Sequence, residues 1–235
     1  MSSWLELVEN KLEAVHLPLG RVEYVRTYHL QARLHELRCQ GKITDTVITV
    51  EHEPVFTIGR SGSASNLLVP LKVLKHEGIS VYETERGGNI TYHGPGQLVV
   101  YPIIDLRSQG CDLKRYIRNL EQSVIGFLAR LGIMAERRAG FPGVWVGSRK
   151  IASVGVYVKR WITRHGLALN VDVNKCHFGM INPCGMNIEV VSLNELTEEK
   201  YSLAKVRAGI LSQMEQLFGW RFVEGDAQQY WEKDW

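Results

Sequence analysis

The chain of 235 residues carries 28 Lys and Arg against 25 Asp and Glu, and 45% of its residues are hydrophobic. This composition is typical of a globular protein and excludes an intrinsically disordered one. The net charge of +3 permits an acidic partner but falls short of the basic surface typical of a nucleic-acid-binding protein. No apolar run approaches the roughly 18 residues that a membrane-spanning helix needs.

The first residues of the chain do not resemble a secretory signal, because Glu6 and Glu9 interrupt any apolar stretch and no basic segment precedes them. Four irregularly spaced cysteines do not suggest a disulfide scaffold. We therefore expect a cytoplasmic protein. Without an internal repeat or linker, we expect one compact domain at residues 19–235, preceded by a helical extension at residues 1–18.

The N-terminal part of the chain predicts a helix, a strand and a second helix. Apolar residues at helical spacing predict a short helix over residues 2–16, which Pro18 and Gly20 end. Alternation over residues 22–26 then predicts a strand. A helix with leucines on one side follows to about Gly41.

The middle of the chain mixes strands with two helices. The β-branched run at residues 46–50 predicts a buried strand, and residues 55–58 are expected to continue the same sheet. A short helix over residues 70–77 begins at a proline, and a strand follows over residues 97–104. Asp112 is expected to cap a strongly amphipathic helix.

The C-terminal part predicts two strands over residues 144–158 around a turn at Gly147, a further strand over residues 166–173, and a last helix over residues 203–217. Strands and helices mix without a regular β-α-β rhythm. We therefore expect a single α+β domain with a large mixed, mainly antiparallel sheet flanked by helices.

A glycine-rich segment spans residues 86–97. Its four glycines allow backbone amides to approach a ligand closely, and Arg86 and His93 add polar groups. The segment lacks the glycine spacing of a phosphate-binding loop or a dinucleotide-binding fingerprint. The alternative is a plain hairpin with a Gly-Pro-Gly turn.

Two further segments are candidates for the walls of a site. Lys150 enters an apolar strand, which is costly for an ammonium group unless it is paired. Alternatively, Lys150 points outward together with Arg149. The small residues within 165–171 are suited to the wall of a slot, or to ordinary strand packing.

The cysteines differ in their surroundings. Cys184 stands between Pro183 and Gly185, which favours a turn, and a cysteine on such a rigid loop is a candidate nucleophile. Cys111 is a rival, because it precedes a predicted helix N-terminus that can lower a thiol pKa. Cys39, near a helix end, is expected to be inert.

A metal site is the remaining alternative for the cysteines. Cys176 and His177 are adjacent and Cys184 follows eight residues later, but no fourth ligand stands at a spacing typical of zinc sites. We therefore expect no bound metal.

Taken in order, four segments resemble the lipoyl(octanoyl) transferase family, LipB. They are residues 86–97, 150–153, 165–171 and 182–185, and residues 51–60 upstream are also similar to that family. The resemblance covers about residues 20 to 220. The chain departs from the family at residues 186–188, and residues 1–18 have no counterpart there, which concerns the edge of the pocket and partner fit more than the chemistry.

The resemblance implies the fold of biotin and lipoate protein ligases. It implies transfer of an octanoyl or lipoyl group from acyl carrier protein to a lysine on the lipoyl domains of 2-oxoacid dehydrogenases and on the glycine cleavage H protein. By the same resemblance, Cys184 is the nucleophile that carries the acyl group as a thioester, and Lys150 lowers its pKa. No cofactor is expected, because a thioester donor is already activated.

The resemblance also implies a set of substrate-binding residues. They are Arg86, Gly87, Gly88, Asn89, Ile90, Thr91, Tyr92, His93, Ser153, Val154, Gly155, Gly166, Leu167 and Ala168. Three other functions remain open. They are an ATP-dependent lipoate–protein ligase, a non-catalytic protein that binds acyl carrier protein or lipoyl domains, and a cysteine hydrolase, although no His–Asn or His–Asp pair is indicated by spacing.

A run of cations surrounds the candidate site in the sequence. It consists of Arg137, Arg138, Arg149, Lys159, Arg160 and Arg164. Acyl carrier proteins are acidic, so these cations are either a steering surface for that partner or an ordinary solvated face.

Overall fold

The computed structural model describes residues 12–183 and 188–231, so the predicted nucleophile Cys184 lies outside the described residues. The helices are α1 (Tyr24–Cys39), α2 (Leu71–His76), α3 (Leu113–Arg130), α4 (Lys175–Phe178) and α5 (Leu203–Phe218), with short 3-10 turns at Ala64–Asn66, Leu106–Gln109, Leu193–Glu195 and Ala227–Tyr230. The strands are β1 (Leu12–Val22), β2 (Thr46–His52), β3 (Val55–Ile58), β4 (Ser80–Glu83), β5 (Ile90–His93), β6 (Gln97–Ile103), β7 (Glu136–Arg138), β8 (Phe141–Val146), β9 (Arg149–Lys159), β10 (Ile162–Asn170) and β11 (Trp220–Glu224).

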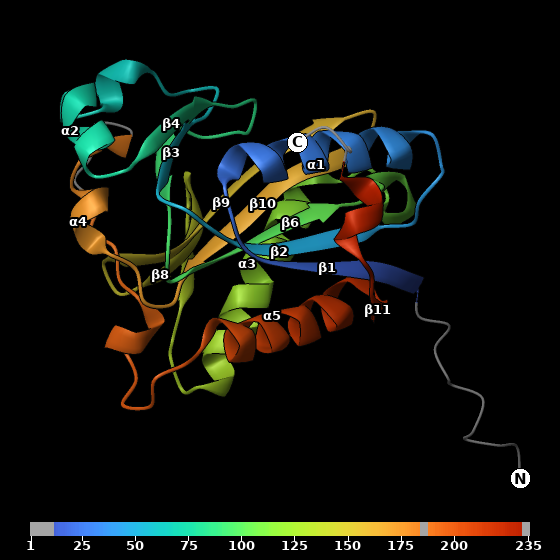
Figure 1. Ribbon diagram of the computed structural model, residues 1–235. Helices are drawn as coiled ribbons and strands as arrows, with labels where there is room; N and C mark the ends of the chain where they lie inside the picture. Colours follow the sequence, from blue (N-terminus) through green and yellow to red (C-terminus); the bar gives the residue numbers. More distant parts are fainter. Residues whose placement is uncertain (1–11, 184–187, 232–235) are drawn as a thin grey trace, which may run out of the picture.

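Within the described residues, the strands form one large and one small sheet (Figure 1). The large sheet has eight strands in the order β11-β1-β2-β6-β10-β9-β8-β7, and its two parallel pairings are those of β1 with β11 and with β2. This mixed, mainly antiparallel sheet confirms the predicted fold class. The small sheet has the order β4-β3-β5. Residues 55–58 form the predicted strand, but they belong to this second sheet and do not continue the first.

The N-terminal predictions need correction. Residues 12–22 form β1, which lies between β2 and β11, so the predicted helix over residues 2–16 and the helical extension are wrong from Leu12 to Pro18. Residues 1–11 lie outside the described residues. Tyr24 begins α1 and does not extend a strand. The apolar spacing did not decide the conformation here; pairing with β2 and with the distant strand β11 did.

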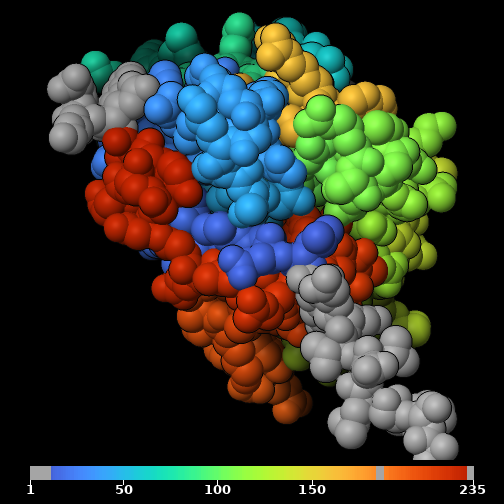
Figure 2. Space-filling model, turned by 90° about the vertical axis from the view of Figure 1, so that its right-hand side faces the viewer, coloured from blue at the N-terminus to red at the C-terminus, as the bar shows by residue number. Residues whose placement is uncertain are grey.

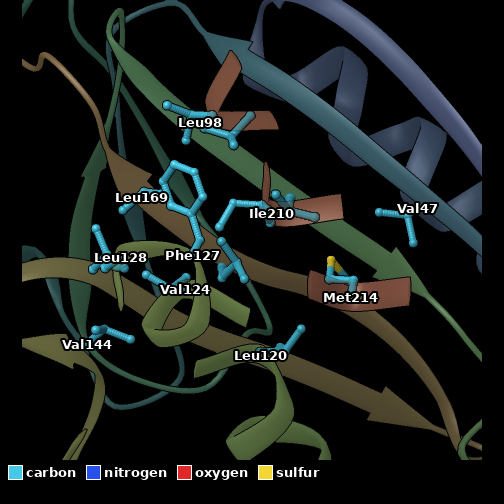
Figure 3. Close-up of a cluster of buried hydrophobic side chains, with 14 of the residues drawn as sticks. Val47, Leu98, Leu120, Val124, Phe127, Leu128, Val144, Leu169, Ile210 and Met214 are labelled. Carbon is cyan, nitrogen blue, oxygen red and sulfur yellow. The ribbon is translucent and has the colours of Figure 1, made fainter. Parts of the chain in front are cut away.

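One face of the large sheet is covered by α3 and α5 (Figure 1). The side chain of Asp112 accepts a hydrogen bond from the Arg115 amide at 2.9 Å, so the predicted helix cap is confirmed. Figure 3 shows Leu120, Val124 and Phe127 from α3 meeting side chains of α5 and the strands. Leu113, in the first turn of the helix, lies beyond the packed stripe and is exposed.

The other face is covered only in part, by α1. Leu30 and Leu34 of α1 pack on Ile48 and on neighbouring residues of β2, β6 and β10. Beside α1, the C-terminal turn at 227–230 contacts both α1 and β1. Next to this turn, the Arg26 guanidinium stands 4.9 Å from the Trp231 ring centroid. Figure 2 shows these C-terminal residues in red beside the blue N-terminal elements.

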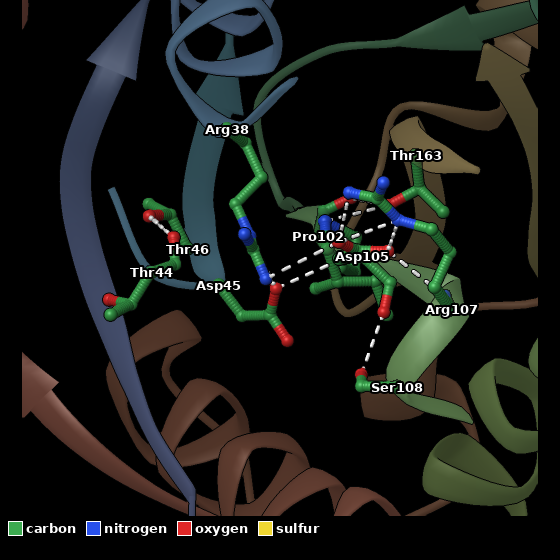
Figure 4. A network of polar contacts seen from close by, with 10 residues as sticks. Arg38, Thr44, Asp45, Thr46, Pro102, Asp105, Arg107, Ser108 and Thr163 are labelled. Atoms are coloured by element: carbon green, nitrogen blue, oxygen red, sulfur yellow. Dashed lines mark hydrogen bonds and ion pairs between the residues drawn. The ribbon is translucent and has the colours of Figure 1, made fainter. Parts of the chain in front are cut away.

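A network of hydrogen bonds and ion pairs connects α1 to the ends of β2 and β6 (Figure 4). Asp45 accepts from Arg38 Nε at 2.9 Å and from the Asp105 amide at 3.0 Å. Asp105 in turn accepts from Arg107, and this hydrogen bond lowers the pKa of the Asp105 carboxyl. None of these residues lines the cavity described below, so the network serves the fold.

Candidate active site

The glycine-rich segment links the two sheets. The hairpin alternative is wrong, because β5 pairs with β3 in the small sheet while β6 pairs with β2 and β10 in the large one. Gly96, with a φ of +81°, makes the turn between them, and its carbonyl accepts from the amides of Val171 and Asp172. A Cβ on Gly96 would overlap the Asp172 carbonyl, so the turn requires glycine.

Arg86 is fixed at the start of this segment. Its guanidinium donates to Thr57 Oγ1 at 2.9 Å from Nη2 and 3.1 Å from Nε, and to the Gly87 carbonyl at 3.1 Å. Arg86 is buried, and burial lowers the pKa of its guanidinium. These contacts hold the backbone of the following glycines between β3 and β9, where the Gly87 amide donates to the Val156 carbonyl at 2.9 Å.

The second wall comes from β9 and β10, which pair across the middle of the large sheet. Gly166 faces Gly155, Leu167 faces Val154 and Ala168 faces Ser153 in register. A Cβ on Gly166 would lie 2.7 Å from Pro102 Cδ and would overlap the Val100 carbonyl. The glycine therefore allows β10 to approach β6 closely.

These two walls enclose a cavity of about 700 Å³. Every predicted substrate-binding residue lines it except Tyr92. Tyr92 packs with Phe56 in the core of the small sheet, and its hydroxyl stands 2.8 Å from His177 Nδ1. Segments widely separated in the sequence are thus brought to one cavity.

Lys150 also lines the cavity, so the alternative in which it points outward with Arg149 is not supported. Its Nζ stands 5.4 Å from the ring centroid of Trp145, its partner across β8 and β9. The register slips by one residue beside this pair, which leaves Ile151 as the extra residue of a β-bulge. Bulges of this kind re-aim side chains next to active sites.

The residues on both sides of the undescribed stretch 184–187 are tied to the cavity. On the N-terminal side, the Asn182 amide donates to the Asn66 carbonyl at 2.9 Å, and Pro183 lines the cavity. On the C-terminal side, the Lys150 amide donates to the Glu189 carbonyl at 2.8 Å, and the bridge continues at residue 190. The chain after position 187 therefore pairs with the strand that carries Lys150.

Sequence reasoning missed a polar group in the same cavity. His165 lines it, with a φ of +57° in the middle of β10, and Nε2 of His165 stands 3.6 Å from Glu85 Oε1. Arg164 pairs with the same carboxylate at 2.8 Å. Burial raises the pKa of Glu85, but its contact with His165 and the charge of Arg164 outweigh it and hold the pKa at about 2. The sequence signals were the position of His165 directly before Gly166 and its place in the segment 165–171 that resembles the family.

The three cysteines within the described residues lie away from the cavity. Cys39, Cys111 and Cys176 are free thiols, and none of the three lines the cavity. Among residues 12–183 and 188–231, no group of three His, Cys, Asp or Glu side chains is placed to hold a metal ion. No helix in the same residues is long and apolar enough to cross a membrane.

Comparison with known proteins gives a consistent result. Residues 23–215 match the lipoyl protein ligase A/B catalytic domain family. The chain is 43% identical over 215 residues to an octanoyltransferase of Caldicellulosiruptor saccharolyticus, covering 90% of this chain and 91% of that protein. It is 44% identical to an octanoyltransferase of Syntrophobacter fumaroxidans, covering 88% and 91%.

The similarity to solved structures concerns the fold alone. A putative lipoate protein ligase from T. acidophilum superposes with a TM-score of 0.73 at 16% identity, covering 93% of this chain and 92% of that one. A lipoate-protein ligase A bound with ATP gives 0.73 at 15% identity, covering 95% of each chain. The predicted resemblance in fold to lipoate protein ligases is confirmed.

Proposed function

Because the chain belongs to the octanoyltransferase family, with its lipoyl protein ligase A/B catalytic domain, we propose that it transfers an octanoyl group through a thioester on Cys184 with Lys150 as its partner. The donor is octanoyl–acyl carrier protein and the acceptor is a lysine of a lipoyl domain. One observation carries the proposal: Lys150 and Pro183, the chain neighbour of Cys184, line the same cavity as the predicted substrate-binding segments.

The chemistry needs two proton transfers, and one lysine can perform both. The Cys184 thiolate attacks the donor carbonyl, the bond from carbon to the carrier sulfur breaks, and the carrier leaves as a thiol with the proton of the Lys150 ammonium. Neutral Lys150 then takes a proton from the acceptor amine as that nitrogen attacks the Cys184 thioester. An amide forms and Cys184 leaves as a thiolate, ready for another cycle.

The cavity suits an acyl chain. Val99, Tyr101, Leu167 and Ala168 give it an apolar wall on the large sheet. An octanoyl tail of about seven carbons, buried at roughly 0.8 kcal/mol per methylene, contributes about 5 kcal/mol, which suffices to select it over shorter acyl groups. A volume of about 700 Å³ also leaves room for the arm of the donor or the acceptor lysine beside the tail.

Intact-mass spectrometry tests the thioester. After mixing with octanoyl–acyl carrier protein, the protein should gain one octanoyl unit, and Cys184→Ser should abolish both the gain and transfer. Cys111→Ser and Cys176→Ser are matched controls and should keep both. A label on Cys111 or Cys176 contradicts the assignment, and transfer from free octanoate that requires ATP would favour the ligase alternative.

The role of Lys150 is tested by alkylating Cys184 across a range of pH. An ammonium close to a thiolate lowers its pKa below the ordinary value near 8.5. Lys150→Ala should raise the apparent pKa of alkylation and lose transfer. Lys150→Arg keeps the charge but supplies no base, so it should retain alkylation at low pH and lose transfer to the acceptor. Lys150→Ala with an unchanged profile and near wild-type transfer would refute the dyad.

A further inference from the structure

The side chain of Lys150 passes directly over Gly143 of the neighbouring strand. A Cβ built on Gly143 would lie 2.5 Å from Lys150 Cε and 3.2 Å from Nζ, and it would also overlap the Ala152 carbonyl. The φ of Gly143 is +131°, a conformation that other L-residues avoid. Both the space and the backbone conformation at this position therefore require glycine.

A buried carboxylate holds Gly143 in place from beneath the sheet. Glu121 of α3 is 5% exposed, and its Oε1 accepts from the Gly143 amide at 2.9 Å. Its Oε2 accepts from Arg137 Nε at 3.0 Å, and Arg137 also donates to the Arg118 carbonyl at 2.9 Å. A buried, ion-paired carboxylate bound to a backbone amide is rigid, because either contact is costly to leave unmade.

From these contacts we propose that Gly143, held by Glu121, is a positioning residue that sets the path of the Lys150 side chain into the cavity. The inference rests on the proposed role of Lys150 and deepens it. The β-bulge at Ile151 turns Lys150 toward the cavity, and the bare backbone of Gly143 lets the side chain pass. A displacement of about 1 Å at a reacting group can cost about a hundredfold in rate.

The main test compares two glycines of the same β-hairpin. Gly143→Ala should lower octanoyl transfer by about a hundredfold and move the apparent pKa of Cys184 alkylation toward its ordinary value. Gly147→Ala is the matched control, because Gly147 also has a positive φ, +56°, but a Cβ there meets nothing within 4 Å. Equal transfer and equal alkylation profiles in the two variants would overturn the inference.

A second pair of variants serves if Gly143→Ala does not fold. Glu121→Gln keeps an oxygen that accepts from the Gly143 amide but loses the ion pair with Arg137, whereas Glu121→Ala loses both. We expect Glu121→Ala to shift the alkylation profile in the same direction as Gly143→Ala, and Glu121→Gln to restore it toward wild type. Identical profiles in the two Glu121 variants would contradict positioning through the backbone.

The Lys150→Ala background separates this inference from the proposed function. There, Gly143→Ala should cause no further loss of transfer and no further shift in alkylation, since the side chain that Gly143 positions is gone. A further loss would show that Gly143 acts independently of Lys150, which overturns the inference and leaves the dyad intact. If Lys150→Ala alone changes nothing, the dyad and the inference both fail.

Discussion

The two faces of the large sheet differ in what covers them, although the same strands supply both. On β6, Val100 packs toward α3 and α5 while Val99 and Tyr101 line the cavity. On β10, Leu169 packs into the same core while Ala168 lines the cavity. Because side chains alternate along a strand, these neighbouring residues serve the fold and the site separately, whereas Leu167 belongs to the core and also lines the cavity. Substitutions on the two faces should therefore have separable effects.

The largest expected effect lies on the closed face. Leu120 of α3 is fully buried in the core and does not line the cavity. Leu120→Ala should lower the free energy of unfolding by about 2 to 5 kcal/mol, because it removes apolar contacts and leaves a void. Urea unfolding measures this change. Transfer per folded molecule should be unaffected. A loss of transfer in fully folded variant protein would show that the effects on the two faces are not separable.

Acid should destabilise the fold through its buried histidines, which include His52 and His16 on the two faces of the large sheet. Burial lowers the pKa of His52, beside Tyr101, and of His16, beside Phe222, to about 4. The unfolded chain, with histidine pKa values near 6.5, binds more protons than the folded protein between those values. Stability should therefore fall as pH decreases from 6.5 to 4, by on the order of 2 to 3 kcal/mol per histidine, and should be flat above that range.

Urea unfolding at several pH values checks this dependence. His52→Gln and His16→Gln each replace a titrating ring with an amide that does not titrate, so each should remove part of the slope between pH 4 and 6.5. If neither substitution changes the slope, His52 and His16 are not its source.

A smaller and selective effect is expected on the cavity face. Ala168→Leu should lower octanoyl transfer about tenfold relative to butanoyl transfer, because the added carbons occupy space that the acyl tail needs. The matched control is Ala152→Leu, which overpacks the α3/α5 core and should cost about 1 to 3 kcal/mol of stability. The ratio of octanoyl to butanoyl transfer should stay unchanged in this control, and a shifted ratio would contradict the comparison.

The smallest effect concerns the cations around the site. Arg164 is buried against Glu85 and Arg137 is paired with Glu121, so these two do not belong to a free steering surface. If the others attract an acidic donor, transfer at sub-saturating acyl carrier protein should slow about threefold as ionic strength rises from about 0.05 to about 0.3 M.

Neutral variants of the cation run test whether these residues cause the dependence of transfer on salt. Arg149→Gln and Arg160→Gln should flatten the dependence on salt. Lys42→Gln, an exposed change in the loop after α1, should not alter it. A rate that is flat with salt in the unmodified protein would remove the steering idea.

Most helices and strands could be predicted from local pattern. The α3 cap at Asp112 and the strands around Gly147 follow from capping chemistry and hydrophobic spacing, which are properties of neighbouring residues. The predictions failed where pairing with a strand distant in the sequence decided the conformation. Residues 12–22 form a strand because β2 and β11 lie on either side of it. Residues 55–58 were expected in the large sheet but pair with β5 in the small one. Neither partner is visible in a local window of sequence.

The residue types and the order of the motifs were enough to predict the segments of the candidate site, because they carry the family resemblance, and they singled out Lys150 and Cys184. The folded structure was needed to show that Lys150 lines the cavity, that Tyr92 packs in a core, and that His165 lines the cavity with Glu85 3.6 Å from its Nε2. The reason is physical: a strand's side chains alternate between faces, and a bulge such as that at Ile151 or a bare backbone such as that of Gly143 sets which face a side chain reaches.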